Sequence, residues 1–199
     1  MTYELFIIGF CAYLFAGVIK GTIGIGLPTI TISIMSQFVD PRVAISFLLL
    51  PALITNSWQI YRGGRIANSA STLWPFGLTM MITIYFSSLF APDIPFKWLV
   101  AGIGIMVVLW TITSLIKTPP RLPDKYDLPV QVGGGFFGGV IGGLTAIWSP
   151  PMVVYLHARK FDKDDFVAHT GFIIMCGTIP LFFGSVSYTH LTLPTNREV

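Results

Sequence analysis

Four stretches of the chain are predominantly apolar and contain no Asp, Glu, Lys or Arg: residues 43–61, 72–91, 98–116 and 166–186. A helix of about 20 apolar residues is long enough to cross the roughly 30 Å hydrocarbon core of a lipid bilayer. We therefore predict that each of these stretches forms one transmembrane helix.

Two further apolar stretches are longer and carry breaks. Residues 5–38 are interrupted by Lys20, several glycines and Pro28, and residues 128–158, which contain no formal charge, are interrupted by Ser-Pro-Pro at 149–151. Proline and glycine both interrupt helices. We predict that each stretch forms two shorter helical pieces that meet at a break.

The overall composition is typical of a membrane protein and excludes a soluble enzyme. Of the 199 residues, 53% are apolar and only 11% are charged, and the mean hydropathy is +0.74. Soluble domains carry about a quarter charged residues. The predicted fold class is an all-α polytopic membrane protein surrounded by the lipid bilayer. Cys11 and Cys176 lack the spacing of a metal site, so we expect no metal and no cofactor.

Basic residues are distributed unevenly between the two ends of the predicted helices. Arg42 and Lys97 fall at one end, and eight others fall at the opposite end: Arg62, Arg65, Lys117, Arg121, Lys125, Arg159, Lys160 and Lys163. By the positive-inside rule the second end is cytoplasmic and the N-terminus lies outside. Because the basic residues form no continuous basic face, no nucleic-acid partner is expected.

A repeat relates the two broken stretches. Residues 17–28 read GVIKGTIGIGLP and residues 139–150 read GVIGGLTAIWSP, so that six of twelve positions are identical. An aspartate, Asp40 or Asp162, follows twelve residues after each final proline. Duplication explains these matches better than a chance similarity of glycine-rich sequence. An odd number of helical pieces separates the two starts, which predicts an inverted repeat.

The repeat also predicts the domain organisation. The first copy covers residues 1–127, ending in a loop at 117–127, and the second covers 128–186 and lacks counterparts to the last two spans of the first. Residues 187–199 are polar and aperiodic. We expect this segment to be a non-native tail on a truncated gene product, with a genuine short tail as the alternative.

The two breaks are candidate binding sites. A broken helix frees backbone N–H and C=O groups that lipid cannot satisfy, so such backbone faces protein or a water-filled cavity. N–H groups at the start of a half-helix can hold an anion, and inverted repeats with broken helices are typical of secondary transporters. The candidate substrate-binding residues at the breaks are Gly21, Gly24, Gly26, Pro28, Gly143, Thr145, Ser149 and Pro150.

The polar residues in the apolar segments each have two interpretations. Lys20 is costly at membrane depth and would serve as counter-charge to an anion, or it would extend to the headgroups. Asn56, a further candidate, shares a helix face with Gln59 and would line the pathway or hydrogen-bond a neighbouring helix. The hydroxyl groups of Thr145 and Ser149 would donate to substrate or cap a half-helix.

The residues of the two breaks also resemble a known family. Residues 20–28 and 142–151 are similar to the paired signatures of the sulfite exporter TauE/SafE family of membrane transporters, with Ala146-Ile147-Trp148 standing where glycine is usual. The resemblance runs from about residue 5 to residue 186. It implies a carrier in the bacterial inner membrane that moves small anions, with sulfite, sulfonates and related organic acids as the substrate class.

The leading hypothesis is therefore a secondary transporter that holds a small anion where the two breaks meet. The alternative is a non-transporting membrane subunit or scaffold whose glycines serve helix packing alone. We expect no enzymatic activity, because no nucleophile has a base at matching membrane depth. The sequence leaves the substrate, the direction, the coupling ion and homo-oligomer formation open.

Overall fold

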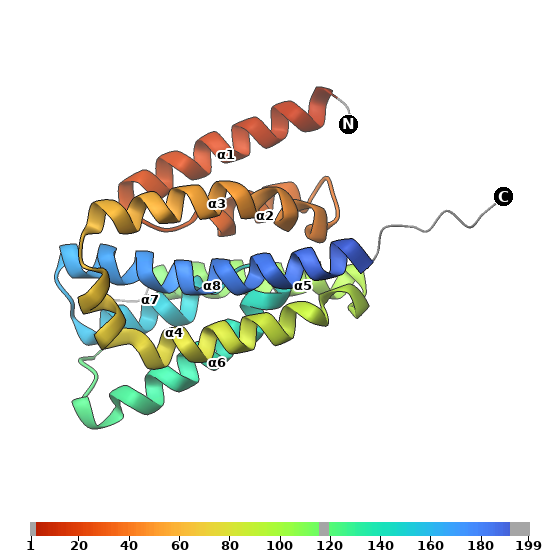
Figure 1. The fold of residues 1–199 in the computed structure, drawn as a ribbon. Coiled ribbons are helices and arrows are strands. Elements are labelled where there is room, and N and C mark those ends of the chain that lie inside the picture. Colours follow the sequence, from red (N-terminus) through yellow and green to blue (C-terminus); the bar gives the residue numbers. More distant parts are fainter. Residues whose placement is uncertain (1–2, 116–119, 192–199) are drawn as a thin grey trace.

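The computed structural model describes residues 3–115 and 120–191. Within these ranges the regular elements are helices, which confirms the predicted all-α class (Figure 1). In chain order they are α1 (Tyr3–Ile23), α2 (Leu27–Met35), α3 (Pro41–Gly63), α4 (Ile66–Leu89), η1 (Ala91–Asp93), α5 (Phe96–Leu115), η2 (Asp124–Tyr126), α6 (Asp127–Thr145), α7 (Ser149–Arg159) and α8 (Lys163–Leu191).

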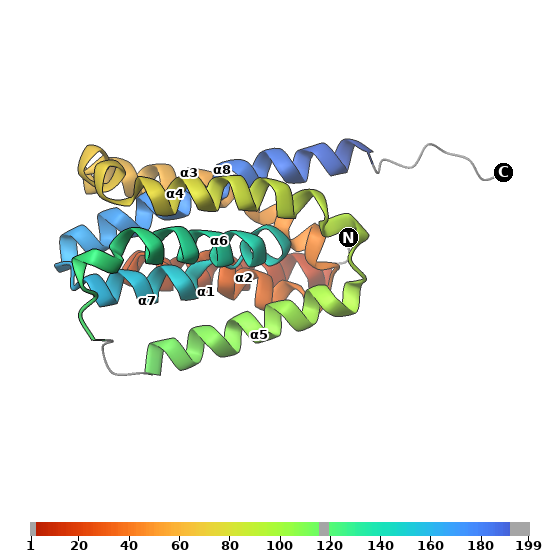
Figure 2. The ribbon, with the colours of Figure 1, turned by 90° about the horizontal axis from the view of Figure 1, so that it is seen from below.

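The four uninterrupted apolar stretches form the long helices α3, α4, α5 and α8, which run roughly parallel or antiparallel to one another (Figures 1 and 2). Among the described residues, five helices are long and apolar enough to cross a membrane: Phe6–Ile23, Pro41–Gly63, Ile66–Leu89, Asp124–Thr145 and Lys163–Gly184. Helix α5 contributes a shorter apolar segment, Lys97–Leu109. The chain is a multi-pass membrane protein.

Each broken stretch forms a long helix followed by a short helix that turns back on it. Helix α2 follows α1 in this way, and α7 follows α6 (Figure 1). Gly24 and Gly26 make the first reversal with φ of +82° and +109°, a region that glycine adopts at little cost. Ala146 makes the second with φ of +56° although it carries a Cβ. Pro28 and Pro150 then stand in the first turns of α2 and α7, where a missing N–H is tolerated.

Helix α4 packs closely against α6 along a row of glycines. Gly135, Gly139 and Gly143 recur every fourth residue and face α4, with backbone or side-chain atoms of α4 in the space that a Cβ would need. The hydroxyl of Thr83 donates to Gly135 O at 3.4 Å and that of Ser87 donates to Gly139 O at 3.1 Å. This is the small-residue packing that brings transmembrane helices into backbone contact.

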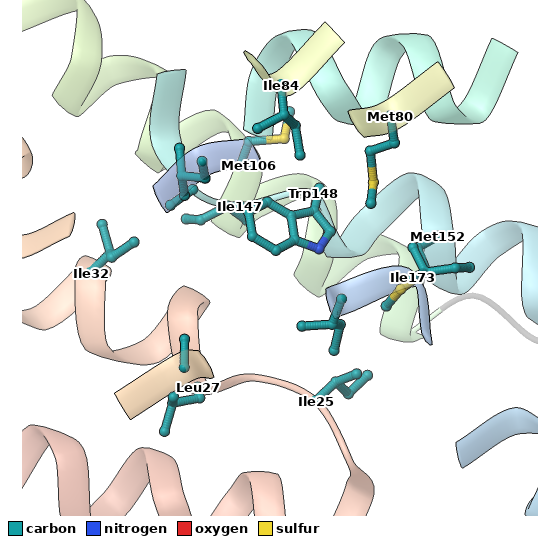
Figure 3. Close-up of a cluster of buried hydrophobic side chains, with 14 of the residues drawn as sticks. Ile25, Leu27, Ile32, Met80, Ile84, Met106, Ile147, Trp148, Met152 and Ile173 are labelled. Carbon is teal, nitrogen blue, oxygen red and sulfur yellow. The ribbon is translucent and has the colours of Figure 1, made fainter. Parts of the chain in front are cut away.

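A hydrophobic core surrounds the second break. Ile147 and Trp148, which connect α6 to α7, are 0% and 3% exposed. Figure 3 shows the Trp148 indole among side chains from α4, α7 and α8 and close to the first break, including Met80, Ile84, Met152, Ile173, Ile25 and Leu27. The second break is therefore filled by its own side chains.

Seven of the eight basic residues predicted to share one end lie where α3 and α7 end and where α4, α6 and α8 begin (Figure 1). Arg65 pairs with Asp165 at 2.6 Å and Arg159 pairs with Asp124 at 2.7 Å, which ties these helix ends together. Of the eight basic residues predicted there, Lys117 lies outside the described residues. Which end faces the cytoplasm stays a prediction.

Two parts of the predicted organisation remain predictions. The inverted relation between the copies 1–127 and 128–186 is one of them. The other is the tail at 187–199: residues 187–191 continue α8, and residues 192–199 lie outside the described residues, as do residues 116–119 at the start of the predicted loop.

Candidate functional site

A cavity of about 770 Å³ lies at the basic end, between the C-terminal halves of α1 and α3 and the start of α8. Its walls combine glycine, polar, apolar and charged residues. The residues that line it are Gly17, Lys20, Gly21, Thr22, Gly24, Leu27, Ile54, Thr55, Trp58, Gln59, Arg62, Gly63, Arg65, Lys163, Asp164 and Val167.

Lys20 is the buried charge of this cavity. Its side chain is 8% exposed and its ammonium group donates to Asn56 Oδ1. Asn56, itself 0% exposed, donates from Nδ2 to Thr178 Oγ1 at 3.0 Å, and Thr178 donates to Ile174 O at 2.8 Å. This chain of hydrogen bonds from α1 through α3 to α8 holds Lys20 toward the bundle interior, and the side chain does not extend outward as the headgroup interpretation required.

Lys20 has no compensating negative charge in the part of the chain that the structure describes, because no carboxylate there lies within 4.0 Å of its ammonium group. An ammonium group has three N–H donors, and the bond to Asn56 uses one of them. A buried charge without a counter-charge is costly, so the geometry favours a bound anion at this position.

The cavity mouth adds to the positive potential. Arg62 and Lys163 are exposed there, and Asp164 is the acidic residue among the lining side chains. Arg65 also lines the mouth but donates to Asp165, whose carboxylate raises the pKa of Arg65. A cleft lined mainly by one sign of charge concentrates ions of the opposite sign.

The glycines of the first break make room in the cavity. A Cβ at Gly17 or Gly21 would meet no heavy atom within 4 Å, so neither glycine packs against another helix. Gly24 lines the cavity at the reversal, and a Cβ added to it would lie 3.3 Å from Gln59 Nε2. Gly26 and Pro28 lie at the start of α2 and do not line the cavity.

The second break contributes no lining residue to this cavity. The Thr145 hydroxyl donates to Ile141 O at 2.9 Å and accepts from Ile147 N at 3.3 Å, so it caps the freed backbone of the break. Ser149 Oγ lies 3.5 Å from Thr29 Oγ1, and the two breaks meet at this contact. The cavity and the meeting point of the breaks are thus neighbouring but different places.

The two remaining candidates at the second break also lie elsewhere. Gly143 packs against α4, where a Cβ would come within 2.6 Å of Ile84 O. Pro150 lines a second, almost entirely apolar groove between α5, α6 and α7. Of the sequence-predicted residues, the structure therefore brings together Lys20, Gly21, Gly24 and, directly behind Lys20, Asn56.

The sequence did not predict that Arg62, Arg65 and Lys163 line the cavity, because these residues were interpreted only as signals of membrane orientation. Helical spacing could have identified Arg62, since it follows Gln59 by three residues and Thr55 by seven and so lies on the same face of α3. Within the described residues no group of three or more His, Cys, Asp or Glu side chains could hold a metal ion.

Comparison with known proteins matches residues 8–195 to the model of the family described as "Sulfite exporter TauE/SafE". No curated protein and no solved structure matches the chain. The matched range includes every residue that lines the cavity.

Proposed function

Since the chain belongs to the sulfite exporter TauE/SafE family of membrane transporters, we propose that it is a secondary transporter of small anions in a bacterial inner membrane, with Lys20 as the anion-binding charge. The observation that supports this most is the position of Lys20. It is a buried cation that lines a cavity and has no carboxylate partner among the described residues. An anion in the cavity would supply the missing counter-charge.

We infer that the cavity opens to the cytoplasm, the side from which an exporter would load its substrate. Arg62, Arg65 and Lys163 stand at helix ends on the basic side, which the positive-inside rule assigns to the cytoplasm. The exposed cations attract the anion to the mouth, and Lys20 then binds it deeper, where water screens its charge less.

Release on the other side requires a barrier to open. Leu27 lines the inner part of the cavity and belongs to the same buried core as Ile147 and Trp148. Beyond it, Thr29 and Ser149 join the starts of α2 and α7. Separation of the two half-helices at this contact would expose the anion to the opposite side, which is the alternating access expected of secondary transporters.

Lys20→Gln is expected to raise the KM for sulfite uptake into proteoliposomes about 10- to 100-fold, because a hydrogen bond to a charged group is worth about 1.5–3 kcal/mol. Glutamine keeps a donor for Asn56 and removes only the charge. The matched control is Lys97→Gln, since Lys97 is exposed at the opposite end, and its KM is expected to stay unchanged. Equal KM values for Lys20→Gln and the parent protein would refute the role of Lys20.

A labelling experiment separates a transporter from a non-transporting scaffold. In a variant without Cys11 and Cys176, Gly21→Cys is expected to react with a membrane-impermeant maleimide because nothing within 4 Å of its Cβ excludes water. Val18→Cys, 61% exposed on the same helix but not lining the cavity, should face lipid and stay unlabelled. Ala16→Cys, 0% exposed, is the buried control. Failure of Gly21→Cys to react would favour the scaffold.

A further inference from the structure

The cavity has an apolar wall beside its charges. Ile54 and Trp58 lie one helical turn apart on α3, both line the cavity, and they are 61% and 60% exposed. Arg62 follows one turn later at the mouth. Along this edge of α3 the lining therefore changes from apolar to cationic over two turns.

The opposite wall leaves space for a ligand with some bulk. Gly17 and Gly21 of α1 lie one turn apart, line the cavity, and have no heavy atom within 4 Å of an added Cβ. The cavity volume of about 770 Å³ falls within the range of about 300–1,000 Å³ typical of sites for organic ligands. A bare inorganic anion at Lys20 would leave the wall formed by Ile54 and Trp58 without a contact.

We propose that the site prefers organic anions that carry an apolar body of several carbon atoms, with the anionic group at Lys20 and the body along Trp58 and Ile54. This inference rests on the proposed function and narrows its substrate class. Lys20 fixes the anionic group because Arg65 is paired with Asp165 and the exposed cations at the mouth are screened by water. The remaining contact that the cavity offers is apolar.

A series of linear alkane-1-sulfonates tests this proposal. Methane- to hexane-1-sulfonate would be used to inhibit sulfite uptake by the full chain in proteoliposomes. Full burial of a methylene group tightens binding about fourfold. Burial against one wall contributes about half of that free energy, which tightens binding about twofold. We expect the inhibition constant to fall about two- to fourfold for each added methylene group.

Two variants test which residues cause the dependence of the inhibition constant on chain length. Trp58→Ala is expected to flatten the dependence of the inhibition constant on chain length, and Lys20→Gln is expected to weaken every sulfonate by a similar factor. Trp74→Ala is the matched control, because Trp74 is 58% exposed on α4 and does not line the cavity. Its chain-length dependence should equal that of the parent protein.

The outcomes separate this inference from the proposed function. Inhibition that is independent of chain length but still requires Lys20 would overturn the apolar preference and leave anion transport standing. The same slope in Trp58→Ala as in the parent protein would overturn it too, because the slope would then come from partition into the bilayer. If no anion is transported or inhibits transport, the proposed function itself fails.

Discussion

Gly143→Leu is expected to yield no folded protein, because α4 leaves no space for a side chain at this position. A Cβ at Gly143 would lie 2.6 Å from Ile84 O and 2.9 Å from Ser88 N, and both are backbone atoms that move only if the two helices separate. Overpacking of a close-packed interior costs about 1–3 kcal/mol even when side chains adapt. The measurement is the fraction of monodisperse protein after detergent extraction, together with its thermal unfolding.

The matched control lies on the same helix. Gly133→Leu adds the same side chain where nothing lies within 4 Å of the Cβ, so its yield and unfolding temperature are expected to equal those of the parent protein. Gly143→Ala should be intermediate, destabilised by about 1–3 kcal/mol. Comparable yields of Gly143→Leu and Gly133→Leu would show that α4 and α6 do not pack through this glycine.

The repeat predicted where the two breaks lie, but it did not predict what each glycine contacts. Gly21 and Gly143 occupy the same position of the two copies, yet Gly21 borders open space and Gly143 touches the backbone of α4. Gly24 and Ala146 are likewise paired by the repeat, and both adopt positive φ. The backbone geometry of the break is therefore the same in both copies, whereas the contacts of a glycine depend on which helix lies opposite, and that neighbour is not encoded nearby.

In the candidate site, too, the sequence predicted individual residues but not the contacts between them. Lys20 and Asn56 could be identified because a polar residue in an apolar helix needs a reason to be there. Their contact joins residues 36 positions apart, and it required knowledge that α1 and α3 flank one cavity. In the repeat, Trp148 stands where the first copy has Gly26, and only the packed core shows that its indole fills the second break. Helix periodicity supplies faces, but packing decides which faces meet.

A second large effect is expected at a proline inside α4. Pro75 lacks an N–H and interrupts the helical hydrogen bonds around it. The Gln131 side chain of α6, 2% exposed, occupies this point: its Nε2 donates to Thr72 O at 3.1 Å and its Oε1 accepts from Phe76 N at 3.4 Å. Thr72 and Phe76 are four residues apart, the pair that bonds directly in a regular α-helix. The amide therefore bridges the helix at the proline.

Gln131→Leu is expected to lower the free energy of unfolding by about 2–4 kcal/mol, because the buried N–H of Phe76 and the half-buried C=O of Thr72 lose a partner at about 1–3 kcal/mol each. Leucine has a similar size and no polar atom, so the change removes the bridge without a large cavity. The measurement is unfolding in mixed detergent micelles, followed by circular dichroism. Gln37→Leu is the matched control, since Gln37 is exposed and makes one long bond, 3.5 Å, to Ser33 O. Its stability should not change, and equal stability of the two variants would mean that α4 does not depend on the amide of Gln131.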